Sequence, residues 1–171
     1  MILTLPLSLN DIKNLKAGDS VFLSGAVLTA RDCAHKRIDE YLDGNKQLPF
    51  EIKDSVIYYA GPCPAKNGMA SGSCGPTTSS RMESFAPRLL DMGLRAIIGK
   101  GEISKEVVTA IKRNGAIYFS AIGGAGALYA SRINKSECIA FEDLLTEAVY
   151  KLEVKNFPVV VACDSYGNCI Y

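Results

Sequence analysis

Cationic side chains stand beside glycines or helix starts in three stretches of the sequence. The stretches are TARDCAH at residues 29–35, GPTTSSRM at 75–82 and IIGKG at 97–101, and they contribute Arg31, Arg81 and Lys100. A guanidinium binds a carboxylate through two parallel hydrogen bonds. Two arginines and a lysine gathered at one place therefore suit a dicarboxylate better than a single phosphate.

The stretch GPTTSSRM predicts a helix that starts near Ser79. Thr77 or Thr78 would then be the N-cap, and Arg81 would lie in the first turn. A cation is disfavoured there, because the helix dipole is positive at that end, unless a bound anion neutralises both. The alternative, left open by the residues alone, is that Thr78 caps the helix and Arg81 extends into solvent.

The other two stretches also have ordinary structural explanations. In TARDCAH, Asp32 is expected to act as a helix cap only, Arg31 equally fits a salt bridge, and His35 is more often a buried structural residue than a catalyst. In IIGKG, the glycines allow close approach of a ligand, or form a plain turn with a solvated Lys100. The functional interpretation depends on the three stretches lying together.

The hydrophobic pattern predicts an α/β fold with a central, mostly parallel sheet, flanking helices and β-rich ends. Expected strands cover 21–30, 54–61, 94–101, 116–124 and 137–141, and expected helices cover 33–43, 82–92, 103–115 and 126–133. Residues 148–171 are expected to form two or three strands with tight turns at Lys155–Asn156 and Tyr166–Gly167. Because ligands collect where the strands of such sheets end, the three stretches are well placed for a site.

The composition is that of one globular domain over residues 1–171, with 48% hydrophobic and 22% charged residues. A net charge of +1 argues against a general attraction to nucleic acid or to anionic membranes. We find no membrane-spanning segment and no secretory leader in the sequence, so a cytoplasmic location is expected.

Six cysteines are present, without a Cys-x-x-Cys pair, so no metal site is expected from this chain alone. They are expected to be free thiols, and a disulfide between Cys163 and Cys169, which flank the turn DSYGN, is the less favoured alternative. A partial dinucleotide motif around Gly124 and Gly126 has Tyr129 in place of its third glycine, which argues against a nicotinamide site.

Five stretches, in this order, resemble the β subunit, or C-terminal domain, of the iron–sulfur hydro-lyases, which include class I fumarases and L-tartrate dehydratases. They are LSGAVLTARDCAHKR, YYAGPCPAKNG, GPTTSSRMESF, IIGKG and YFSAIGGAGAL. The resemblance implies a swivelling β/β/α domain and the reversible hydration of fumarate to L-malate. It also implies an α subunit whose cysteines bind a [4Fe–4S] cluster, and a hetero-oligomer such as a dimer of heterodimers.

The resemblance also implies roles for single residues. Thr77 would lie close to the proton that is moved, Arg31 and Arg81 would hold substrate carboxylates, and Lys100 would contact a carboxylate, with Thr78 as a further binding residue. His35 would belong to the active site without an assigned role.

The stretch GEIS after Lys100 differs from the Gly-Asn of many fumarases and from the Gly-Gly-Met of many tartrate enzymes. The sequence ends at YGNCIY, without the longer tail of some tartrate dehydratase β subunits, so the resemblance favours fumarate. An L-tartrate dehydratase subunit and a non-catalytic carboxylate-binding assembly subunit are the alternatives.

Overall fold

The computed structural model describes residues 1–66 and 68–171, and in these residues seven strands form one mixed sheet. The strand order is β1-β2-β3-β4-β5-β7-β6, and β2 also pairs with β7, so that β2, β3, β4, β5 and β7 close into a ring. The strands are β1 (Ile2–Thr4), β2 (Ser20–Thr29), β3 (Val56–Tyr58), β4 (Ala96–Gly99), β5 (Ile117–Ser120), β6 (Ile133–Ala140) and β7 (Val149–Cys163).

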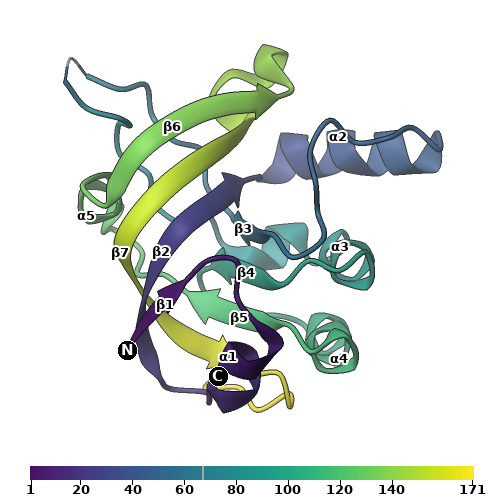
Figure 1. Cartoon of the computed structure of the whole chain (residues 1–171). Coiled ribbons are helices and arrows are strands. Elements are labelled where there is room, and N and C mark those ends of the chain that lie inside the picture. The colour runs from purple at the N-terminus through teal and green to yellow at the C-terminus, as the bar shows by residue number, and fades with distance from the viewer. Residues whose placement is uncertain (67) are drawn as a thin grey trace.

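Strands β1 to β5 are parallel to their neighbours in the order β1-β2-β3-β4-β5, whereas β7 runs antiparallel to β2, β5 and β6. The helices α2, α3 and α4 lie on one side of the sheet (Figure 1). The helices are α1 (Leu9–Asn14), α2 (Asp32–Asp43), α3 (Ala86–Asp91), α4 (Lys105–Asn114) and α5 (Gly126–Ala130), with two short 3-10 helices, η1 (Ser79–Met82) and η2 (Glu142–Glu147). The expected α/β class is confirmed.

The two faces of the short parallel strands contribute to two separate hydrophobic clusters. On β3, Val56 and Tyr58 face the cluster enclosed by the ring of strands, while Ile57 packs with the residues of α2, α3 and α4. Side chains alternate between the faces of a strand, so a strand buried on both faces reads as a continuous apolar run. This arrangement fixes the strand ends rigidly, and the candidate site is built on those ends.

Helix boundaries follow local signals where such signals exist. Ser104 caps α4 by accepting a hydrogen bond from the backbone N–H of Val107, and Gly115 ends the helix with a φ of 59°, as the sequence predicts. The helix expected over 82–92 is instead divided into η1 and α3. Pro87 lies in the first turn of α3, where its missing N–H costs no hydrogen bond.

Two expectations about the C-terminal half are wrong. Lys155 and Asn156 do not form a turn, because β7 is continuous and has one extra residue there opposite Leu23 to Gly25 of β2. Asn156 takes a φ of 51°, a left-handed conformation that asparagine tolerates, so the strand bulges instead of reversing. The helix expected over 126–133 is also shorter, since Ile133 already pairs with β7 as the first residue of β6.

The expectation of six free thiols is also wrong for one pair. Cys163 and Cys169 form a disulfide across the turn at Tyr166–Gly167, which is itself confirmed. The two cysteines are brought together because their backbones form an antiparallel bridge on either side of that turn. In the described residues, no helix is long and apolar enough to cross a bilayer, and the cytoplasmic location stays a prediction.

Candidate active site

The parallel strands β2, β3, β4 and β5 end at one edge of the sheet. Their registers pair Thr29 with Tyr58, Tyr58 with Ile98, and Gly99 with Ser120. The segments that follow these residues therefore leave the sheet side by side. Arg31 follows β2 and Lys100 follows β4, so two of the three cationic stretches meet at this edge, as in other α/β sheets that bind ligands there.

The segment with Thr77 and Thr78 is held at the same edge by its backbone. The N–H of Thr77 donates to the Tyr59 carbonyl at 2.6 Å, and the N–H of Ser79 donates to the Lys100 carbonyl at 2.9 Å. Thr78 also forms a parallel bridge with Lys100. The third cationic stretch is thus inserted between the ends of β3 and β4.

The two threonine hydroxyls are not used to cap a helix. Thr78 occupies the N-cap position of η1, as the sequence allows, but its side chain makes no capping hydrogen bond and is exposed. Thr77 is buried, and within the described part of the chain no hydrogen bond fixes its hydroxyl. Both hydroxyls are therefore left for other partners.

Asp32 joins two of the predicted binding residues. Its Oδ2 lies 3.2 Å from Nε of Arg31, and its Oδ1 lies 2.8 Å from Nε of Arg81. Nε of Arg31 is also 2.7 Å from Oε1 of Glu147. The two guanidinium groups, whose residues are 50 positions apart in the sequence, are thus held beside one carboxylate.

The expectation that Asp32 acts only as a helix cap is wrong. Arg31 is the N-cap of α2, and no side chain caps that helix. Burial raises the pKa of Asp32, but hydrogen bonds from its own backbone N–H, from Arg31 and from Arg81 outweigh burial and hold the pKa below its usual value. Asp32 is therefore ionised at neutral pH and its charge is shared between two arginines.

His35 lies beneath this cluster and does not reach the surface. Only 1% of the residue is exposed, and its Nδ1 lies 3.0 Å from the Arg31 carbonyl oxygen, to which the neutral ring donates. Its ring packs edge-on against Tyr59 at 5.2 Å, and its Nε2 is buried with no partner in the described residues. Burial lowers the pKa of His35 to about 4, so the ring is neutral near pH 7.

The buried histidine predicts a loss of stability in mild acid. Because its pKa is about 4 in the folded chain and near 6.5 when unfolded, the unfolded chain binds more protons between these values. Stability is complete above pH 6.5 and falls below it, by about 2 kcal/mol between pH 7 and pH 5. Urea unfolding of the wild type and His35→Asn at both pH values measures this, and equal pH slopes for the two proteins would contradict it.

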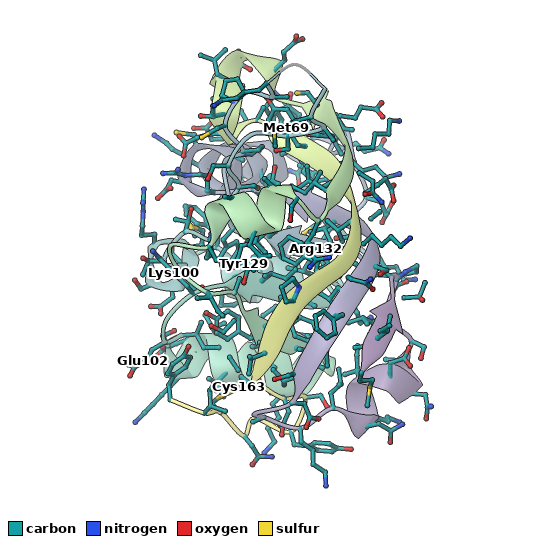
Figure 2. The ribbon with its side chains drawn as sticks, turned by 90° about the vertical axis from the view of Figure 1, so that its left-hand side faces the viewer. Met69, Lys100, Glu102, Tyr129, Arg132 and Cys163 are labelled. Carbon is teal, nitrogen blue, oxygen red and sulfur yellow. A yellow bond between two sulfur atoms is a disulfide. The ribbon has the colours of Figure 1, made fainter. Side chains whose placement is uncertain are left out.

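The Lys100 side chain lies beside the segment that follows β5. A Cβ added to Gly123 would lie 3.5 Å from its Cδ and 3.8 Å from its Nζ. Figure 2 shows Lys100 and Glu102 together on one flank of the molecule. A cavity of about 360 Å³ beside Lys100 is lined by residues of the β5 end and the C-terminal segment, including Ser120 and Tyr171, and does not include the arginines.

The comparison with protein families now identifies the chain. Its residues 2–171 match the family described as "Fumarase C-terminus". The chain belongs to this family. The match extends over nearly the whole sequence, and it confirms the resemblance that the five sequence stretches indicate.

Individual members of the fumarase family support the assignment. The chain is 43% identical to the "Putative L(+)-tartrate dehydratase subunit beta" of Methanocaldococcus jannaschii, over 96% of this chain and 88% of that protein. It is 43% identical to "Fumarate hydratase 2" of Leishmania major and 42% identical to "Fumarate hydratase class I, aerobic" of Escherichia coli K12. These matches cover 90% and 85% of this chain, which spans only 28% and 27% of those two longer proteins.

An iron–sulfur cluster needs a group of metal-binding side chains. Among residues 1–66 and 68–171, no three His, Cys, Asp or Glu side chains are grouped so that they could hold a metal ion. The iron–sulfur cluster that the resemblance implies therefore does not fit the described residues of this chain.

Gly99 is required for the packing of the site, and the family stretch IIGKG contains it. A Cβ on Gly99 would overlap Oγ of Ser79. Ser79 is buried and its Oγ lies 2.9 Å from the hydroxyl of Tyr118, which donates to the Gly101 carbonyl at 2.7 Å. Any side chain at position 99 would displace Ser79 and break this chain of hydrogen bonds.

We expect Gly99→Ala to destabilise the domain by about 1–3 kcal/mol through overpacking. Gly123→Ala is the matched control, because its nearest atom, on the flexible Lys100 side chain, is at an ordinary contact distance of 3.5 Å. Thermal unfolding of both variants measures the difference. A Gly99→Ala melting temperature equal to that of the wild type would show that the packing is less tight than the distances indicate.

Proposed function

We propose that this chain is the β subunit of a hydro-lyase that hydrates fumarate reversibly to L-malate. The proposal depends chiefly on one observation, the pairing of Arg31 and Arg81 through Asp32 at the edge of the sheet where Thr77 and Lys100 also lie. The class I fumarate hydratases among the relatives support the same reaction.

The arginine pair suits a diacid because of the atoms that it leaves free. Each guanidinium contacts Asp32 through Nε, and in the described residues neither makes a hydrogen bond through its terminal nitrogens. Those nitrogens can bind carboxylate oxygens of a substrate. In this proposal Arg31 and Arg81 bind substrate carboxylates, and Lys100 and Thr78 contact the substrate from β4 and η1.

Dehydration of L-malate, the reverse direction, removes a proton from the carbon next to one carboxylate and releases the hydroxyl of the neighbouring carbon as hydroxide, which Lewis-acidic iron of the proposed α subunit would bind. Such carbon acids are very weak, and positive charge near the carboxylate stabilises the negative charge that develops there. Arg31, Arg81 and Lys100 supply that charge. Thr77 is proposed to exchange the proton, with a carboxylate of the partner accepting the hydroxyl proton of Thr77, since a threonine alone is a poor base.

The proposed enzyme requires a second polypeptide. The name of the Methanocaldococcus jannaschii relative describes a β subunit, and the fumarate hydratases are much longer than this chain. We propose an α subunit that carries the [4Fe–4S] cluster, in a hetero-oligomer such as a dimer of heterodimers. The swivelling β/β/α fold that the resemblance implies is also part of this proposal.

L-Tartrate is the second candidate substrate. The relative named as a tartrate dehydratase subunit aligns over 88% of its own length, whereas the fumarate hydratases do so over about a quarter. Tartrate carries a hydroxyl on each central carbon, and the same carboxylate-binding residues would hold both diacids. Residues beyond the arginine pair must therefore distinguish them.

Anaerobic co-purification with the cluster-bearing α subunit tests the proposal. We expect activity only in the complex, with malate turned over faster than tartrate or mesaconate. Arg31→Ala in the same complex should abolish turnover. Faster turnover of tartrate would favour the second candidate, and a complex inactive on all three diacids would support the non-catalytic assembly role.

A further inference from the structure

We propose that Asp32 is a positioning residue, which holds the guanidinium groups of Arg31 and Arg81 at a fixed separation so that both can engage one diacid. This inference depends on the proposed function. Asp32 does not itself contact the substrate in this proposal. It acts through the two arginines.

The contacts divide the carboxylate between the two cations. Oδ1 of Asp32 accepts from Arg81 at 2.8 Å and Oδ2 accepts from Arg31 at 3.2 Å, each through Nε. A hydrogen bond at Nε restricts the orientation of a planar guanidinium, and in the described residues the terminal nitrogens of both arginines make no hydrogen bond. Both arginines are therefore oriented by one group before any substrate binds.

Asp32 stands at the start of a well-packed helix. Asp32 is the first residue of α2, and the next turns of α2 bury Ala34, His35 and Ile38 against the sheet. His35 also holds Arg31, the residue before Asp32. The backbone N–H and the ring Nδ1 of His35 both contact the Arg31 carbonyl oxygen, at 2.9 and 3.0 Å. The carboxylate thus links a fixed helix start to Arg81, which comes from η1 and has half of its side chain exposed.

Charge distinguishes this role from simple attraction of the substrate. Removing the negative charge of Asp32 leaves the pocket more positive, so attraction of a diacid should not weaken. The two arginines would then repel each other and lose their common support. A positioning role therefore predicts a fall in kcat without a matching rise in KM.

Two other carboxylates provide graded controls. Glu147 contacts Arg31 from η2 but does not reach Arg81, so Glu147→Gln removes an equal charge and leaves the bridge. Asp143 pairs with Arg37 at 3.0 Å between η2 and α2, outside the site. Asp143→Asn therefore removes a different ion pair between a carboxylate and an arginine of α2. It leaves Arg31 and Arg81 bound to Asp32.

The test is steady-state kinetics of the α–β complex at low ionic strength, with the melting temperature of each variant. We expect Asp32→Asn to lower kcat by about 10- to 100-fold with less than about a threefold rise in KM. Glu147→Gln should have a much smaller effect and Asp143→Asn none, while Asp32→Glu, which keeps the charge, should recover part of kcat.

The outcomes separate the two proposals. Suppose that the wild-type complex is active. If Asp32→Asn then lowers kcat no more than Glu147→Gln does, or raises KM as much as it lowers kcat, the positioning role alone is overturned. An equal loss of kcat in Asp143→Asn would show a general structural effect and overturn it also. A wild-type complex inactive on every diacid would overturn the proposed function and, with it, this inference.

Discussion

Thr77→Ala should lower kcat of the reconstituted enzyme by about 10²- to 10⁴-fold, with little change in KM. The reason is the position of Thr77, which is buried between the ends of β3 and β4 and held there by its backbone N–H on the Tyr59 carbonyl. Its hydroxyl is the group that we propose exchanges the substrate proton. Removing the hydroxyl leaves the carboxylate-binding arginines in place, so substrate still binds.

Thr77→Ser is the matched control, since it keeps the hydroxyl and loses only a methyl group. It should retain most of the turnover, while Thr78→Ala, at the exposed neighbour, should act mainly on KM. Solvent-exchange of the substrate proton, followed by mass spectrometry, gives a second measurement. Near-normal turnover or exchange in Thr77→Ala would remove Thr77 from the proposed chemistry.

Arg81→Ala should raise KM by about 100-fold and lower kcat as well. The side chain offers two free nitrogens to a carboxylate, and losing a charge-assisted pair of hydrogen bonds weakens binding of the substrate and of the reacting state. Arg81→Ala also leaves Asp32 with Arg31 alone, so the remaining guanidinium is held less firmly. Both steady-state constants for malate should therefore change.

Two variants test whether this effect is specific. Arg81→Lys keeps the charge without the planar fork and should recover little activity. Arg88→Ala removes an arginine that pairs with Asp39 and Asp43 of α2, also at half-exposed positions but away from the site. If Arg88→Ala raised KM as strongly as Arg81→Ala, the effect would reflect loss of support for α2 and not loss of a substrate contact.

The sequence predicts which segments leave the same edge of the sheet, because the relevant signals are local. An apolar strand followed by Arg31, or by Gly99 and Lys100, indicates a strand end, and parallel strands bring their ends to one edge. The cap and stop of α4 are local in the same way.

What the sequence does not predict depends on contacts between distant segments. Asp32 resembles a helix cap to any local analysis, and only the fold shows that Arg81 lies within 2.8 Å of it. Glu147 likewise carries no local signal for its contact with Arg31. The bulge at Asn156 is hidden because its partner on β2 lies more than a hundred residues earlier.

The same long-range pairing has a consequence for synthesis of the protein. The ring of strands closes only when β7 (Val149–Cys163) pairs with β2 (Ser20–Thr29), and β7 is the last strand made. Until then one whole edge of β2 has unpaired backbone groups, which favour association with other chains. On the ribosome this edge of β2 therefore stays unpaired until β7, more than a hundred residues later in the sequence, has been made.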